Sequence, residues 1–199
     1  MKKLSTYLFL ILFSFQTPSW ADDISDFQIE GMSIGDSLLD YFSETEIKNF
    51  KQYNNKNSEY TSDRMYEVEI DKKETSTINI YSAMQISLKT NDKKYKIYAI
   101  RGIIDYTNNI KDCYSKQKQI VNEIKELNFD ATKEQYTKNH VADKSGKSKN
   151  TTTEYKFNSG DLIRISCYDW SKAMGYYDNL RVGVHSSEYL NWIRNEAYE

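Results

Sequence analysis

The feature that most constrains the fold is the pair of cysteines, because each lies on the apolar face of a different predicted element. Around Cys113, apolar side chains recur with helical spacing and predict a helix near 111–127. Around Cys167, apolar side chains alternate and predict a strand over 162–169. Both sulfurs are therefore expected at a helix-on-sheet interface. A disulfide there would close a loop of about 55 residues and contribute roughly 3 to 4 kcal/mol, whereas the alternative is two separate buried thiols.

Alternation of apolar and polar residues predicts the rest of the sheet. Strands are expected at 65–70, 78–88, 95–106, 153–157 and 180–185, with turn residues at 91–94 and 158–161 that favour hairpins. Short helices are expected at 33–42 and 188–196, and a second capping box of Ser43 with Glu46 predicts a helical turn through Ile47 and Phe50. The polar stretch 130–152 is interpreted as a loop that exposes His140. The prediction is an α+β fold, an antiparallel sheet of about five strands with one main helix packed on one face and short helices near both ends.

The first 21 residues have the layout of a signal peptide. Two lysines precede an apolar run over 8–15, and small residues stand at Ser19 and Ala21. The run is shorter than the ~20 residues that span a bilayer. We expect cleavage after Ala21, a periplasmic or secreted location, and a mature chain over 22–199 that forms a single domain without a transmembrane segment.

Composition excludes some function classes. Removal of residues 1–21, which hold two lysines and no acidic residue, changes the formal net charge from −2 to −4. Because a protein that tracks phosphates needs a concentrated basic excess, nucleic acid is not an expected partner. Neither histidine stands near a cysteine in the sequence, so no metal site is predicted, and no motif indicates a cofactor. In an exported chain, an even number of cysteines favours pairing.

The segment 35–38, Gly-Asp-Ser-Leu, resembles the N-terminal block of GDSL-type (SGNH) esterases and lipases. In that family the serine is the nucleophile and a late Asp-x-x-His supplies the base and its orienting carboxylate. The resemblance implies Ser37 as nucleophile and His185 as base. The sequence departs from the family at Val182, where the carboxylate belongs, and lacks a Gly-x-Asn-Asp block for the oxyanion. The alternative interpretation is a helix-capping segment, which needs the same small polar residues.

Two further groups of residues are candidates for a site. Glu67 and Glu69 are interpreted as solvent-facing carboxylates on the polar face of a strand. Aromatic residues gather near the C-terminus, and aromatics with a polar tip are favoured at recognition surfaces. The candidate contact patch comprises Tyr168, Trp170, Tyr176 and Tyr177, with core packing of most of these side chains as the alternative.

Segments 29–43 and 167–171 together look like uncharacterised exported proteins of marine alphaproteobacteria. That resemblance implies a bacterial, periplasmic setting and brings no activity with it. The predicted function is a non-catalytic binding or interaction module of the cell envelope, with an envelope protein or a small ligand as partner. The alternative is a serine hydrolase that uses Ser37 and His185.

Overall fold

The structure, a computed structural model, describes residues 24–54, 56–58, 60–107, 109–127 and 129–199. The predicted signal peptide and its cleavage site after Ala21 lie outside the described residues. Within the described ranges, no helix is both long and apolar enough to cross a bilayer.

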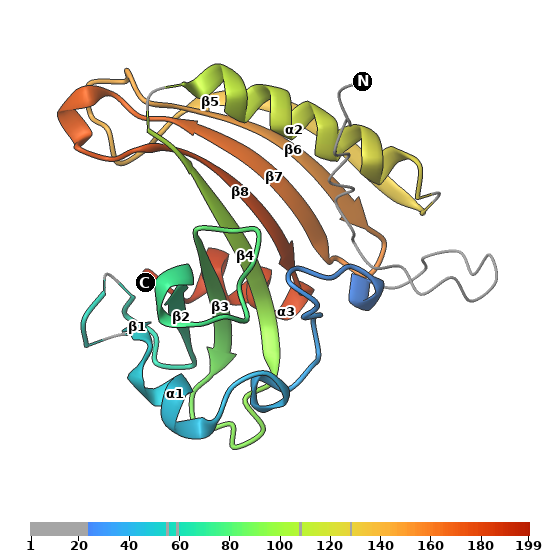
Figure 1. Cartoon of the computed structure of the whole chain (residues 1–199), viewed down its shortest axis with the longest axis vertical. Coiled ribbons are helices and arrows are strands. Elements are labelled where there is room, and N and C mark those ends of the chain that lie inside the picture. The colour runs from blue at the N-terminus through green and yellow to red at the C-terminus, as the bar shows by residue number, and fades with distance from the viewer. Residues whose placement is uncertain (1–23, 55, 59, 108, 128) are drawn as a thin grey trace, which may run out of the picture.

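One open antiparallel sheet of eight strands organises the described chain, in the spatial order β1-β2-β3-β4-β8-β7-β6-β5. Figure 1 shows the long strands curving together, with β4 and β8 at the centre of the sheet. The strands are β1 (Lys51–Tyr53), β2 (Met65–Asp71), β3 (Ala83–Lys89), β4 (Ile97–Tyr106), β5 (Ala131–Asn139), β6 (Lys149–Phe157), β7 (Leu162–Asp169) and β8 (Asp178–His185).

The expectation of about five strands with one main helix is wrong, because the sheet has eight strands and three α-helices accompany it. The largest error is the predicted loop 130–152, which contains β5 and the first part of β6. Nearly every residue of β5 is exposed, so the strand shows no apolar alternation for the sequence to reveal. Its lysines and glutamate are typical of an edge strand that must not pair with another chain.

The three α-helices are α1 (Glu44–Asn49), α2 (Ile110–Lys125) and α3 (Ser187–Asn195). The expected helix over 33–42 is reduced to one 3-10 turn, Leu38–Asp40. The second expected helical turn is confirmed as α1, which follows a capping box between Ser43 and Glu46. The N-terminal segment still buries apolar residues in the main core.

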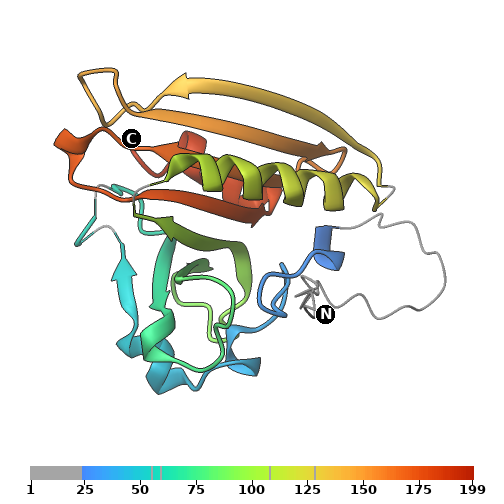
Figure 2. The same ribbon diagram turned by 45° about the horizontal axis from the view of Figure 1, so that its top comes forward.

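The sheet carries a helix on each face, not on one face as expected. On β4, Ile100 belongs to the core that α2 covers, whereas its neighbour Ala99 belongs to a second core with Trp192 of α3. Successive side chains of a strand point to opposite faces, so α2 and α3 lie on opposite sides of the sheet. Figures 1 and 2 show α2 running along the β6–β8 half, with α3 behind the sheet near β4.

The predicted disulfide is confirmed. Cys113 of α2 and Cys167 of β7 are bonded, with 6.0 Å between their Cα atoms, and both are fully buried. Gln117, one turn along the helix, donates from Nε2 to the carbonyl oxygens of Thr151 (2.9 Å) and Ile165 (2.8 Å). The helix is therefore held to the sheet by a covalent bond and by hydrogen bonds to two strands.

Candidate functional site

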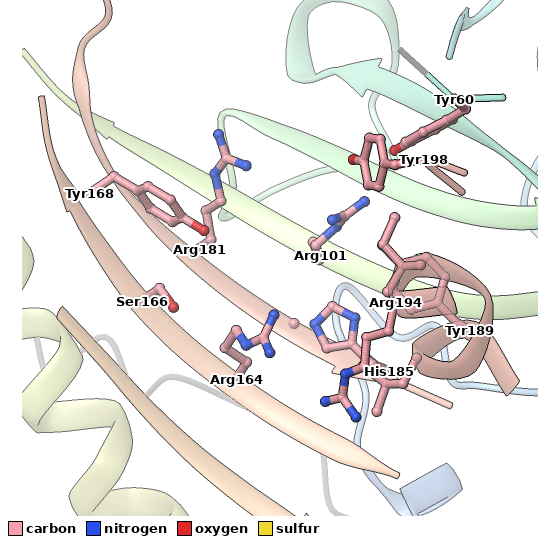
Figure 3. A pocket seen from close by; sticks show the side chains of 13 residues that line it. Tyr60, Arg101, Arg164, Ser166, Tyr168, Arg181, His185, Tyr189, Arg194 and Tyr198 are labelled. Atoms are coloured by element: carbon pink, nitrogen blue, oxygen red, sulfur yellow. The ribbon is translucent and has the colours of Figure 1, made fainter. Parts of the chain in front are cut away.

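Arginine side chains converge on the face of the sheet opposite α2. The chain contains five arginines and 22 lysines. A pocket of about 310 Å³ is lined by four of those arginines, Arg101, Arg164, Arg181 and Arg194, and by no lysine. Figure 3 shows Arg101, Arg164 and Arg194 around the imidazole of His185, with Arg181 beside Tyr168.

Strand register explains why residues distant in sequence meet here. Gly183 of β8 pairs with Arg101 of β4 on one side and with Arg164 of β7 on the other. Neighbouring strands are about 4.8 Å apart, so the two arginines stand about 10 Å apart across the glycine. Arg181 and His185 lie two residues before and after Gly183 and share its face.

Gly183 leaves room for the imidazole. A Cβ atom at position 183 would lie 2.5 Å from His185 Nε2 and 2.8 Å from Arg101 Cγ. The imidazole therefore lies over the main chain of β8 and forms part of the pocket floor. A larger residue at this position would push His185 and Arg101 out of place.

Arg101 is held by a buried carboxylate. Its guanidinium donates to Glu67 Oε1, which also accepts from the hydroxyls of Ser87 (3.0 Å) and Tyr189 (3.1 Å). Burial opposes ionisation of Glu67, but Arg101 and these hydrogen bonds outweigh it and hold the pKa of the carboxyl below its usual value. The interpretation of Glu67 as solvent-facing is wrong, since its side chain is 5% exposed; Glu69 is 24% exposed.

The other arginines differ in how they are paired. Arg164 Nε donates to Glu154 Oε1 at 2.7 Å. Arg181 Nε donates to Asn179 at 3.1 Å, and its guanidinium lies 4.5 Å from the centre of the Tyr168 ring. Among the described residues, no carboxylate forms an ion pair with Arg181 or Arg194. Two positive charges at the pocket are therefore left without an ion-pair partner.

His185 is buried among these charges and is 2% exposed. Burial, and then the positive charges of Arg101, Arg164 and Arg194, hold its pKa well below the usual value, so the imidazole is neutral near pH 7. Its Nδ1 atom and Arg101 Nε are buried without a hydrogen-bond partner in the described part of the chain. Unpaired buried polar atoms are costly, so these two atoms favour a partner from outside the protein chain, such as water or a bound group.

Ser37 and His185 are not joined by any hydrogen bond between described residues. The Ser37 hydroxyl donates to the Lys94 carbonyl oxygen at 2.7 Å and accepts from the Leu39 amide at 3.2 Å, as the N-cap of a 3-10 turn. His185 Nδ1 has no carboxylate to orient it, and the arginines around the ring disfavour its protonation. The hydrolase interpretation stays a prediction that no contact supports.

The predicted contact patch divides between the pocket and its surroundings. Tyr168 lines the pocket and stacks on Trp170, with ring centres 5.9 Å apart and an interplanar angle of 18°. Tyr176 packs on Trp170 at 4.9 Å, and His140 packs on it at 4.3 Å. Tyr177 is 64% exposed, and no ring contact of this cluster includes it.

No cluster of three or more His, Cys, Asp or Glu side chains within the described ranges has the geometry to hold a metal ion. Comparison of the chain with protein-family models, curated proteins and solved structures gave no significant match. The resemblances to exported proteins and to GDSL esterases therefore stay predictions, and function must be argued from the pocket itself.

The arginines are the site residues that the sequence analysis does not single out, and Glu67 is named there only as a solvent-facing carboxylate. One signal was present: in a chain with 22 lysines, the five arginines stand apart, and Arg101, Arg164 and Arg181 each lie within a predicted strand. Because arginine is rare in this chain and binds oxygen anions better than lysine does, its positions in the predicted strands indicated the site.

Proposed function

We propose that this protein is an exported, periplasmic, non-catalytic binding module that captures an anionic ligand in the arginine-lined pocket. The observation that carries the proposal is the concentration of four of the five arginines, and no lysine, at a single pocket. The predicted signal peptide and the disulfide support the location, because disulfides persist in oxidising compartments.

The choice of arginine over lysine is chemically informative. Guanidinium is planar, always charged and presents several donors in a fixed fork that matches carboxylate, sulfate and phosphate oxygens. Lysine is a compact, strongly hydrated charge that suffices to keep a surface soluble. A chain that uses lysine nearly everywhere else and arginine here is built to bind oxygen anions at this place.

The competing explanation is that the arginines neutralise internal carboxylates. It accounts for Arg101 with Glu67 and for Arg164 with Glu154. It leaves Arg194 and the unpartnered His185 Nδ1 unexplained, and it gives Arg181 only an attraction to Asp105 without an ion pair between described residues. The two paired arginines are better described as preorganised by their carboxylates, so that little freedom is lost when an anion arrives.

A thermal-shift titration with citrate, inorganic phosphate and sulfate tests the proposal. Binding to the folded state alone stabilises it by about 2.7 kcal/mol at 100 times Kd, which would raise the Tm by about 5 to 11 °C for a chain of this size. At least one anion should produce a saturable shift that weakens with added sodium chloride.

Matched double variants provide the control. Arg181→Gln with Arg194→Gln removes the two arginines without an ion pair, and Lys118→Gln with Lys125→Gln removes the same charge from exposed positions on α2. The arginine pair should lose at least tenfold in anion affinity, and the lysine pair should keep it. No shift with any anion, or equal loss in both double variants, would overturn the proposal.

A further inference from the structure

An aromatic cluster adjoins the pocket through Tyr168. We name it the aromatic shelf and define it as Tyr168, Trp170, Tyr176 and His140. Trp170 is its centre, with ring centres of the other three at 5.9, 4.9 and 4.3 Å respectively. Tyr176 is 61% exposed, so solvent reaches the outer part of the shelf.

Tyr168 belongs to both the shelf and the pocket. It lines the pocket, and its ring lies under the guanidinium of Arg181 at 4.5 Å while it stacks on Trp170. Figure 3 shows Tyr168 and Arg181 side by side at one end of the pocket. A ligand whose charged group lies among the arginines would therefore meet aromatic rings as it leaves the pocket.

The shelf is fixed in place by hydrogen bonds from two loops. Asp143 Oδ2 accepts from the hydroxyls of Ser148 (2.7 Å) and Ser171 (2.8 Å), and the Ser171 amide donates to Ser148 Oγ at 2.9 Å. The amide of Trp170 donates to Asp178 at 2.8 Å. The loop that carries His140 is thus tied to the segment that follows Trp170, which keeps the rings preorganised.

Trp170 also carries an unused donor. Its Nε1 atom is buried and has no hydrogen-bond partner among the described residues. Buried indole N–H groups usually find an acceptor. The atom is a third buried polar group without a partner among the described residues, after His185 Nδ1 and Arg101 Nε, and it lies beneath the surface of the shelf.

We infer that the arginine-lined pocket and the aromatic shelf form one continuous site for an acidic saccharide, with the charged group among the arginines and sugar rings on the shelf. The inference rests on the proposed function and names its ligand class. Pyranose C–H groups pack on the negative faces of aromatic rings, and sugar hydroxyls accept hydrogen bonds from guanidinium groups. The pocket, at about 310 Å³, is at the small end of ligand sites and leaves further sugar rings outside on the shelf.

A mononucleotide would also combine an anion with a ring, and the structure favours the saccharide over it. Phosphates of nucleotides are commonly cradled by main-chain amides at a helix N-terminus, whereas the arginines of this pocket come from β4, β7, β8 and the last turn of α3. The aromatic rings pack on one another around Trp170, and no two of them lie as parallel walls on either side of a gap for one base. Mononucleotide binding is therefore an outcome of the test and not part of the proposal.

Isothermal titration with matched tetrasaccharides tests the inference, using protein purified from the periplasm of an expression host. The acidic probes are tetragalacturonate and sulfated maltotetraose. Their neutral counterparts are fully methyl-esterified tetragalacturonate and unmodified maltotetraose. At least one acidic tetrasaccharide should bind at least tenfold more tightly than its neutral counterpart and than monomeric galacturonate or sulfate.

Two adjacent tyrosines supply the matched variants. Tyr176→Ala removes a ring of the shelf, and Tyr177→Ala removes an equally exposed ring that is not part of it. Tyr176→Ala should lower the affinity for the acidic tetrasaccharide about 3- to 10-fold and leave the affinities for citrate, phosphate and sulfate unchanged. Tyr177→Ala should leave all of these affinities unchanged.

The outcomes separate this inference from the proposed function. If simple anions bind through Arg181 and Arg194 but tetrasaccharides gain nothing from the shelf, the inference fails and the anion pocket stands. Tighter binding of adenosine monophosphate than of either acidic tetrasaccharide would also overturn the inference alone. If no anion of any kind binds, both fail.

Discussion

Substitution of Glu67 by glutamine should destabilise the protein far more than the same change at Glu69. Both glutamates lie on β2, two residues apart, and share one face of the sheet. Glu67 is buried in an ion pair with Arg101, whereas Glu69 is partly exposed and pairs with Lys51, whose side chain is 63% exposed. The two variants therefore compare one chemical change in two environments.

The expected magnitudes follow from burial. Removal of one partner of a buried ion pair costs about 3 to 5 kcal/mol, because the other charge stays buried without compensation. The Arg101 side chain is 18% exposed at the pocket, which places Glu67→Gln near the lower end, about 3 kcal/mol, or a Tm lower by about 6 to 12 °C. An exposed pair contributes within about 1 kcal/mol, so Glu69→Gln should lie in that range.

Urea denaturation at pH 7 and at lower pH measures both effects. The pKa of Glu67 is lowered in the folded state, so its contribution is present above the unfolded value near 4.5 and is lost as pH falls through the lower folded value. The difference in free energy of unfolding between wild type and Glu67→Gln should become smaller in that acidic range. Equal destabilisation by Glu67→Gln and Glu69→Gln at pH 7 would refute the reasoning. A difference between wild type and Glu67→Gln that does not change with pH would refute it as well.

Three further predictions concern the disulfide, the buried histidine and the main helix. Replacement of Cys113 and Cys167 by serine should lower the free energy of unfolding by about 4 kcal/mol, since the bond spans a sequence separation of 54; an unchanged urea midpoint would contradict this. The pKa of His185 is lowered in the folded state, so the unfolded chain takes up a proton first and stability falls as pH drops below about 6.5. The free energy of unfolding should fall by at most about 1.4 kcal/mol per pH unit there, and His185→Gln should make the fall smaller. An equally steep dependence of the free energy of unfolding on pH in the variant would count against a neutral imidazole. Gln117→Leu removes both hydrogen bonds from the helix to the strand carbonyls and should cost about 1 to 3 kcal/mol by chemical denaturation. Gln119→Leu on the exposed side of the helix should cost less than about 0.5 kcal/mol, and similar values for the two would be inconsistent with the buried contacts.

Local patterns in the sequence were sufficient for the elements that bury one face. The helical stripe through Cys113 and the alternation through Cys167 predicted a bond that the structure contains. The strands over 65–70, 95–106 and 162–169 also appear close to their expected bounds. In each case the apolar residues themselves report the period of the element, so no long-range information is needed.

Edge strands escaped prediction because they bury little. β5 pairs along nine residues with β6, yet the main-chain hydrogen bonds that hold it leave no trace in its side chains. The same pairing explains why β6 begins as early as Lys149. Its first residues are polar, and they form a strand because β5 and β7 pair with them on either side.

The site was decided by tertiary structure. Alternation could show that Arg101, Arg164 and Glu67 share a polar face, but it could not show that β8 lies between β4 and β7 and brings the two arginines together across Gly183. Nor could it show that α3 folds over that face and buries Glu67 beneath Tyr189. A sequence specifies on which side of a strand a residue points, because that depends on neighbours along the chain. Whether that side is covered, and by what, depends on segments far away in sequence, and here that difference turned an ordinary polar face into a charged pocket.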